Sequence, residues 1–467
     1  MKTNHYVKTT AILLAILFNV AFLQAQDVAG HWNSVLRVQG TNLRLIFNIT
    51  KTDAGYTSTM DSPDQGALGI PIATTVFDGS KLSLAVPAIG FSYEGEFKTD
   101  SIVGTFKQGG LSLPLTLHRT TTEIKPPARP QEPKPPFPYR SEDVTFENKT
   151  AGITLAGTLT MPQTGNNFTA VILISGSGAQ DRNQEIMGHK PFLVIADYLT
   201  RQGIAVLRYD DRGTAQSTGN FATATTADFA TDVESAIAYL KTRNEINHRK
   251  IGLIGHSEGG VIAPMVASQS EDVAFIVMLA GTGLRGDKIL LLQNELVSRA
   301  MGMPEDQIKR GNKVSAMIYD KIINAEELAS RQEMTDFIMS LKNELVEFLP
   351  QGLSVNDYIR NLAMQMSSPW MQYFIRHDPS FTLEKVRCPV FAVTGSKDLQ
   401  VPAKENLTAI SRALERGGNT KVTIREYPGL NHLFQECTTG LPTKYATIEQ
   451  TFSPIVLRDL VEWIKSQ

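Results

Sequence analysis

The stretch that decides the fold is KIGLIGHSEGGVIAPMVAS, residues 250–268. An apolar run with strand character ends near Gly255, and an apolar run with helical periodicity begins near Gly259. Ser257 lies between these glycines. Each glycine occupies a position where a β-carbon would collide with the neighbouring backbone. The pattern therefore predicts a sharp strand-to-helix turn that presents a serine hydroxyl beside the positive end of a helix.

The sequence around this turn alternates between apolar strand-like runs and helical periods. It begins with the hairpin-like VTFENKTAGITLAGTLTMP (144–162) and ends with a helix near ATIEQTFSPIVLRDLVEWIKS (446–466). Apolar strands joined by helices indicate a mostly parallel sheet with helices on both faces, so we predict an α/β domain over residues 141–467. In such a sheet, ligands bind beyond the carboxyl ends of the strands.

One long insertion interrupts this alternation at about residues 282–383 and has helical periodicity throughout. Because it stands between two strands of the sheet, we expect it above the strand ends, as a lid. Its segment PWMQYF contains Trp370 and Phe374, which could line an apolar acyl pocket. Ordinary helix packing explains these aromatic residues equally well.

The N-terminal part differs from the rest of the chain. Residues 26–120 contain short alternating segments separated by turns, which predict a small all-β barrel or sandwich of about eight strands. Its Gly30-His31-Trp32 opening resembles the first strand of lipocalin-like barrels. Residues 121–140 hold seven of the 23 prolines, so we expect an extended linker between two domains.

The first residues and the composition limit where the protein works. Residues 1–25 combine early lysines with an apolar run that is too short to span a bilayer, and a small residue, Ala25, precedes Gln26. They predict a cleaved signal peptide and an exported, periplasmic or secreted, protein without stable membrane insertion. Lys plus Arg total 45 against 47 for Asp plus Glu, which disfavours nucleic acid as a partner.

A serine hydroxyl needs a general base to act as a nucleophile at neutral pH. His432, in YPGLNHLFQE, follows the strand-like run KVTIREYP and is therefore expected in a loop at the active edge. Asp398, in VTGSKDLQVP, follows the preceding strand at the same edge and would hold the imidazole. We predict Ser257 as nucleophile, His432 as base and Asp398 as its partner, with His189 and His377 as alternative bases.

Two backbone N–H groups are candidates for an oxyanion hole. The N–H of Glu258 begins the helix after the serine, and the N–H of Ser177 lies in VILISGSGAQDRNQ, the loop after the first long parallel strand. Gly176 and Gly178 let this loop approach a substrate closely. A phosphate-binding loop is excluded because no Lys-Ser/Thr pair follows.

Taken together, SGSGAQDRN, RYDDRGTAQSTG, GHSEGG, TGSKD, LNHLFQ and PWMQYFIRHDP resemble the EstD-type carboxylesterases of the α/β-hydrolase superfamily, close to the serine aminopeptidase S33-like group. The resemblance covers about residues 141–467. It implies the roles given above for the serine, histidine, aspartate and oxyanion-hole residues, and loop-bracing ion pairs for Asp181-Arg182 and Asp210-Asp211-Arg212. Ala179 stands where this family more often has proline.

The primary hypothesis is an exported serine hydrolase that cleaves small carboxylic esters through an acyl-enzyme and needs no cofactor. No metal-ligand motif is present in the sequence. Two alternatives remain open: a peptidase or aminopeptidase of S33-like type, and a binding protein on a hydrolase fold. The sequence does not identify a partner for the N-terminal domain.

Overall fold

The computed structural model describes residues 27–38, 41–121 and 127–467. The predicted signal peptide at residues 1–25 lies outside the described residues. The chain forms two compact units. Among the described residues, the first unit comprises those before 126 except 63–67, together with 351–353, and the second comprises the rest.

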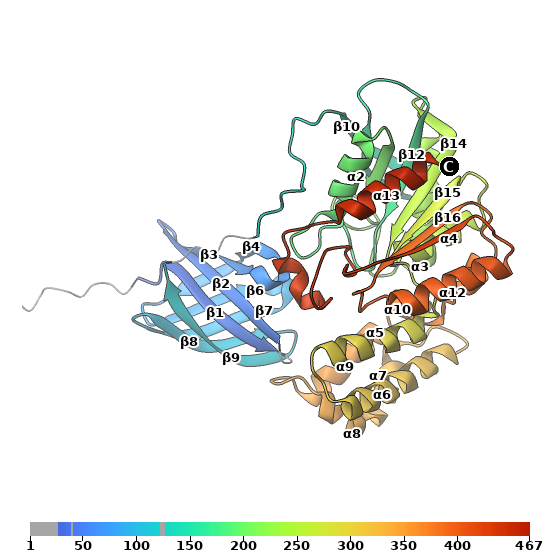
Figure 1. Ribbon diagram of the computed structural model, residues 1–467. Helices are drawn as coiled ribbons and strands as arrows, with labels where there is room; N and C mark the ends of the chain where they lie inside the picture. Colours follow the sequence, from blue (N-terminus) through green and yellow to red (C-terminus); the bar gives the residue numbers. More distant parts are fainter. Residues whose placement is uncertain (1–26, 39–40, 122–126) are drawn as a thin grey trace, which may run out of the picture. The chain divides into compact units, whose positions relative to one another are not determined.

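The first unit is built on one nine-stranded sheet with the order β4-β3-β2-β1-β9-β8-β7-β6-β5 (Figure 1). Its strands are β1 (Gly30–Val38), β2 (Thr41–Thr52), β3 (Gly55–Ser62), β4 (Ala67–Ile72), β5 (Thr74–Phe77), β6 (Lys81–Val86), β7 (Phe91–Lys98), β8 (Ser101–Gln108) and β9 (Leu111–Thr120). Two short 3₁₀ turns, η1 (Pro63–Gln65) and η2 (Pro87–Ile89), interrupt the chain.

The sheet curls until β5 lies against β3, and the Ser58 and Thr75 hydroxyls hydrogen bond at 2.6 Å. Alternate side chains point inward around Trp32, Phe47 and Tyr93, which are fully buried. The predicted all-β, barrel-like architecture is confirmed. It has nine strands rather than about eight, because a bend at Ala73 separates the short strands β4 and β5.

The second unit contains an eight-stranded sheet with the order β10-β11-β13-β12-β14-β15-β16-β17. The hairpin of β10 (Arg140–Asn148) and β11 (Ile153–Met161) pairs antiparallel with its neighbours. The remaining strands are parallel: β12 (Phe168–Ile174), β13 (Ala205–Tyr209), β14 (Ile246–His256), β15 (Phe275–Leu279), β16 (Val390–Gly395) and β17 (Val422–Tyr427). The central strands β12 to β16 are almost wholly buried, except for the first part of β14, where residues 248–250 are exposed.

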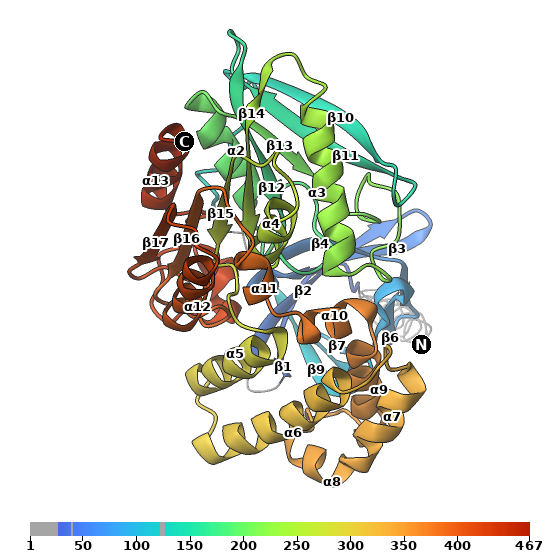
Figure 2. The same cartoon turned by 90° about the vertical axis from the view of Figure 1, so that its right-hand side faces the viewer.

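Helices cover both faces of this sheet (Figure 2). On one face, α2 (Pro191–Arg201) and α13 (Pro454–Lys465) pack over one apolar core. On the other face, α3 (Thr226–Leu240), α4 (Gly259–Ala267) and α12 (Ala403–Arg416) cover a second core. A 3₁₀ segment, η4 (Pro442–Thr447), precedes α13. This confirms the predicted mostly parallel sheet with helices on both faces.

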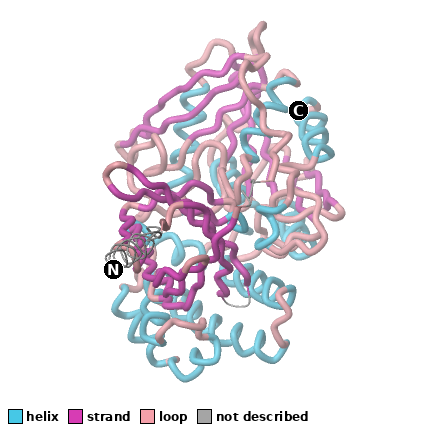
Figure 3. The backbone as a smooth tube through the Cα atoms, turned by 90° about the vertical axis from the view of Figure 1, so that its left-hand side faces the viewer, coloured by secondary structure: helices cyan, strands magenta, loops and turns pink. Residues whose placement is uncertain are grey.

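The helical insertion stands between β15 and β16, and Figure 3 shows its helices in cyan. It comprises α5 (Gly286–Ala300), α6 (Glu305–Ile323), α7 (Arg331–Ser340), α8 (Lys342–Leu345), η3 (Val346–Phe348), α9 (Val355–Met366), α10 (Pro369–Arg376) and α11 (Ser380–Leu383). Most of these helices share an apolar core of their own, whereas Trp370 and Tyr373 of α10 also pack against the core under α3 and α4.

Residues 127–140 of the proline-rich segment belong to the second unit and are held by it. The guanidinium of Arg129 donates to the main-chain oxygens of Gly188, Ala446 and Ile448. The side chain of Gln131 bonds to the backbone of Thr451 and Phe452. At least from Arg129 to Gln131, the predicted linker is therefore anchored to the second unit.

Two further features bear on the protein's environment. Within the described ranges, no helix combines the length and hydropathy needed to cross a bilayer. The two cysteines, Cys388 and Cys437, are free thiols.

Candidate active site

The turn after β14 has the geometry that the flanking glycines predict. Ser257 adopts a left-handed backbone conformation with φ of 54°, which is uncommon for a residue with a side chain, and its N–H donates to Leu279 O at 2.8 Å. A Cβ on Gly255 would lie 1.9 Å from Gly259 O, and a Cβ on Gly259 would lie 2.1 Å from Ile174 O. Only glycine fits at both positions, so the turn holds Ser257 at the carboxyl end of the sheet.

Asp398 and His432 form a hydrogen-bonded pair at the same edge of the sheet. Asp398 follows β16, His432 follows β17, and His432 Nδ1 lies 2.8 Å from Asp398 Oδ2. The other carboxylate oxygen of Asp398 accepts from the N–H groups of Gln400 and Val401, both at 2.8 Å. Because an ionised carboxylate only accepts, Nδ1 of His432 carries the hydrogen and Nε2 has the free lone pair.

The loop that carries His432 is closed by its own buried side chains. Asn431 Oδ1 accepts from the N–H groups of Leu433 and Gln435, and Asn431 Nδ2 donates to Gln435 Oε1 at 2.9 Å. Phe434 takes a φ of 58° within this loop. These contacts fix the backbone on both sides of His432.

Ser257 lies beside this pair, although the structure records no hydrogen bond between its hydroxyl and His432. The ring of His256, the preceding residue, lies 4.8 Å from the His432 ring between centroids. Serine–histidine hydrogen bonds are often long or absent before substrate binds, so the missing bond does not exclude Ser257 as the nucleophile.

The two candidate oxyanion-hole N–H groups have no acceptor among the described residues. The Ser177 loop approaches the serine closely, since a Cβ on Gly176 would lie 3.2 Å from Ser257 Cβ. Asp211 holds this loop by accepting from Ser175 Oγ at 2.6 Å and from the Gln180 N–H at 3.0 Å. Burial raises the pKa of Asp211 to about 7.

The side chain of Glu258 makes contacts that the sequence did not indicate. Its Oε1 accepts from Thr226 Oγ1 and from Trp370 Nε1, both at 2.7 Å. Burial raises its pKa, and the hydrogen bonds from Thr226, Trp370 and Ser177 oppose this effect. Glu258 therefore ties α10 of the insertion to the turn at Ser257, a link that no local sequence pattern could have revealed.

The two aromatic residues predicted for an acyl pocket lie together. Trp370 and Phe374 stack with ring centroids 5.4 Å apart and an interplanar angle of 16°, and both are half-buried. The bond from Trp370 to Glu258 brings this stack to the residue after Ser257. A role in acyl binding stays a prediction.

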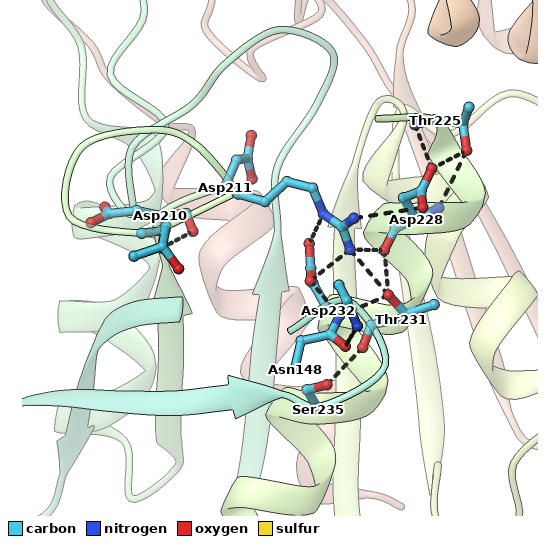
Figure 4. A network of polar contacts seen from close by, with 12 residues as sticks. Asn148, Asp210, Asp211, Thr225, Asp228, Thr231, Asp232 and Ser235 are labelled. Carbon is cyan, nitrogen blue, oxygen red and sulfur yellow. Dashed lines mark hydrogen bonds and ion pairs between the residues drawn. The ribbon is translucent and has the colours of Figure 1, made fainter. Parts of the chain in front are cut away.

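Ion pairs brace the loops around the site. Arg182 pairs with Asp210 at 2.7 Å, and Arg212 pairs with Asp232 at 2.7 Å. Figure 4 shows Asp232 together with Asn148, Thr231 and Asp228, which share hydrogen bonds beside it. Asp211 is the exception within its motif, because it binds the Ser177 loop instead of an arginine.

The two alternative bases have other surroundings. His189 is fully buried and lies within hydrogen-bond distance of Thr451 Oγ1, Tyr445 O and Gln435 Nε2, and burial lowers its pKa to about 4. His377 stacks on Tyr373 at the end of α10, and burial lowers its pKa. Neither imidazole has the carboxylate hydrogen bond that His432 has.

The described residues contain no cluster of three or more histidine, cysteine or acidic side chains that could hold a metal ion. A serine on a strand-to-helix turn of a mostly parallel sheet, with a His–Asp pair after later strands, defines the α/β-hydrolase class. Residues 190–436 match the family described as serine aminopeptidase, S33 (Hydrolase_4). This match covers more than half of the chain, which therefore belongs to this family of hydrolases.

Relatives of this chain carry esterase names. It is 25% identical over 416 residues to Esterase EstD of Thermotoga maritima, a match that covers 88% of this chain and 81% of the relative. Among solved structures, it is similar to the Pyrococcus furiosus esterase Pf2001, with 14% identity, a TM-score of 0.42 and coverage of 70% and 93% of the two chains. Est1E of Butyrivibrio proteoclasticus, bound to ferulic acid, is 17% identical with a TM-score of 0.41 and coverage of 69% and 98%.

Proposed function

We propose that the protein hydrolyses small carboxylic esters through an acyl-enzyme formed on Ser257. His432 Nε2 takes the serine proton as the hydroxyl attacks the ester carbonyl, and then gives it to the leaving alcohol. A water molecule, activated by the same imidazole, releases the acid. The observation that carries this proposal is the Asp398–His432 pair, whose geometry leaves Nε2 free beside the turn at Ser257.

The unpaired N–H groups of Ser177 and Glu258 support this reaction. An ester carbonyl gains negative charge on its oxygen during attack, and fixed N–H donors stabilise that charge. Loss of one such donor typically slows catalysis by about 10²–10³-fold. Because both donors are main-chain groups, Ser177→Ala should have a mild effect.

The likeness to Esterase EstD supports an ester as substrate, whereas the family description also includes aminopeptidases. The two classes can be compared directly with p-nitrophenyl acetate and butyrate against an aminoacyl p-nitroanilide. We expect turnover of the esters that disappears in Ser257→Ala. Faster cleavage of the anilide than of any ester would replace the esterase assignment by the peptidase one.

We further propose that residues 1–25 direct export and that Trp370 and Phe374 contact the acyl group. The short apolar run before Ala25 supports export, and the link from Trp370 to Glu258 supports contact with the substrate. Export is tested by N-terminal sequencing of protein recovered from the periplasm or medium, where Gln26 should be the first residue. Acyl contact is tested by Phe374→Ala, which should raise KM more for butyrate than for acetate esters.

A further inference from the structure

A chain of buried hydrogen bonds runs behind the candidate site and joins its two halves. The N–H of Gly176, next to Ser177, donates to Gln184 Oε1 at 3.2 Å. Gln184 Nε2 lies 2.8 Å from His256 Nδ1, and His256 Nε2 lies 2.9 Å from the main-chain oxygen of His432. The chain thus links the loop of one oxyanion donor to the loop of the base.

The backbone groups at the two ends of this hydrogen-bond chain determine which group donates and which accepts in each bond. A backbone N–H only donates, so the amide oxygen of Gln184 faces Gly176 and its NH₂ group faces His256. A carbonyl oxygen only accepts, so His256 carries its hydrogen on Nε2 and accepts on Nδ1. Each of the three bonds therefore has one donor and one acceptor, and His256 is neutral.

The surroundings of these two side chains are buried and largely apolar. Gln184 is 2% exposed and His256 is 5% exposed. A small cavity beside them is otherwise lined by apolar residues that include Phe192 and Ile195 of α2, Leu279 at the end of β15, and Leu433 and Phe452. The titratable group that faces His256 is His432, and burial lowers the pKa of His256 to about 3.

The backbone at Gln184 is itself held in a strained conformation. Its φ of 49° is in the left-handed region, which costs on the order of 1 kcal/mol or more for such a residue. Its N–H donates to Asp181 O at 2.8 Å, and this bond closes the turn. The fold therefore maintains an unfavourable backbone conformation at the residue whose side chain reaches both loops.

We propose that Gln184 and His256 are positioning residues. They hold the loop of Ser177, which carries one oxyanion donor, at a fixed position relative to the loop of His432, which carries the base. This inference rests on the proposed function of the same site. When His432 takes the serine proton, the nearby imidazole of His256 has both nitrogens occupied by hydrogen bonds. The positive charge then stays on His432, next to Asp398.

Two substitutions of Gln184 separate positioning from packing. Gln184→Met keeps the length of the side chain but removes both hydrogen bonds, so kcat should fall about 10–100-fold with KM within about threefold and an unchanged pH profile. Gln184→Glu can accept from Gly176, but it needs one extra proton to satisfy His256 Nδ1. Its kcat should be near that of the wild type at pH 5 and at least tenfold lower at pH 8.

Wild-type kcat in Gln184→Met, or a Gln184→Glu profile parallel to that of the wild type, would overturn the proposal. A second measurement does not depend on activity: ¹⁵N spectra of the histidine rings in the full-length protein report the tautomer of His256. We expect Nε2–H with an unprotonated Nδ1 at pH 6–8, and an Nδ1–H tautomer would contradict the hydrogen-bond chain. A wild type that cleaves no ester would instead reject the proposed function, so the two failures are distinguishable.

Discussion

The two units of this protein differ in their backbone conformations and in the polar groups that they bury. In the described part of the N-terminal unit, every residue with a left-handed backbone is a glycine, and the buried polar side chains are three serines, Ser34, Ser58 and Ser62. The hydrolase unit has left-handed backbone at Gln184, Ser257, Phe434 and other non-glycine residues. It also buries carboxyl groups such as those of Asp211, Glu258 and Asp398.

This difference shows where the chemistry lies. Strained backbone and buried carboxylates are unfavourable for folding, so a protein retains them where a surrounding network over-determines them, commonly at functional sites. Those at Asp211, Glu258, Asp398 and Phe434 follow the carboxyl ends of β13, β14, β16 and β17. The N-terminal unit follows ordinary barrel packing, which gives it stability but no evident chemistry.

The largest expected effect is that of replacing Ser257 in the hydrolase unit. A matching substitution of Ser58 in the N-terminal unit serves as the comparison. Ser257→Ala should lower kcat on p-nitrophenyl acetate by about a million-fold, the loss that removal of the nucleophile causes in a comparable triad, with little change in melting temperature. Ser58→Ala, which breaks the bond to Thr75, should cost about 1 kcal/mol of stability and leave kcat unchanged. Comparable activity in the two variants would reject Ser257 as nucleophile.

Removing the charge that orients the base should have the next largest effect. Asp398→Asn keeps the size of the side chain, but its amide NH₂ can turn toward His432 and favour the wrong tautomer. We expect kcat to fall by about 10⁴-fold, as the corresponding change does in a serine protease. The variant should still react slowly with an activated ester, and unaltered kcat would contradict the assigned pair.

One glycine in each unit lies so close to a main-chain oxygen that a side chain would not fit, and the two alanine variants can be compared. A Cβ on Gly255 would lie 1.9 Å from Gly259 O, and a Cβ on Gly104 would lie 2.2 Å from Glu94 O. Both alanine variants should therefore lose at least about 2 kcal/mol of stability in thermal melts. Gly255→Ala should also abolish ester hydrolysis, whereas folded Gly104→Ala should keep its kcat.

The last prediction concerns the dependence of stability on pH, which leaves the catalytic groups unchanged. The pKa of Asp211 is raised from an ordinary value near 3.8 to about 7 by burial, so the folded state holds its proton over a range in which the unfolded state has lost it. Its contribution to stability is complete below about pH 4 and is lost as pH rises toward 7. An asparagine side chain cannot titrate, so Asp211→Asn should gain stability relative to the wild type over this window.

Urea melts of both proteins at pH 4, 5, 6 and 7 would measure this difference. The comparison between variants is needed because the lowered pKa values of His189 and His256 give the opposite slope, destabilising the fold as pH falls below about 6.5. A stability difference that does not change between pH 4 and 7 would contradict the raised pKa of Asp211.

The sequence was sufficient for features that depend on local pattern and chain order. Period-two and period-3.6 apolar patterns predicted the strands and helices of both units, and the ends of strands predicted where Asp398 and His432 meet. The bond from Glu258 to Trp370 and the chain through Gln184 and His256 were not predictable in this way. They join segments far apart in the chain through side-chain geometry that leaves no periodic signal.

The proline-rich segment gives a similar lesson. Its composition predicted an extended linker but not that the guanidinium of Arg129 and the amide of Gln131 bind main-chain groups more than 300 positions away. Such anchoring depends on which main-chain groups the folded hydrolase unit leaves without partners. The separation of β4 from β5 likewise depends on a bend at Ala73 that the residue types there do not specify.

The central claim is that Ser257 is an activated nucleophile. The most direct measurement is reaction of the full-length protein with a fluorophosphonate, followed by peptide mass spectrometry. We predict one adduct per molecule on Ser257, absent in Ser257→Ala and formed much more slowly in Asp398→Asn. A correctly folded wild-type protein that takes no label, or takes it on another residue, would contradict the account.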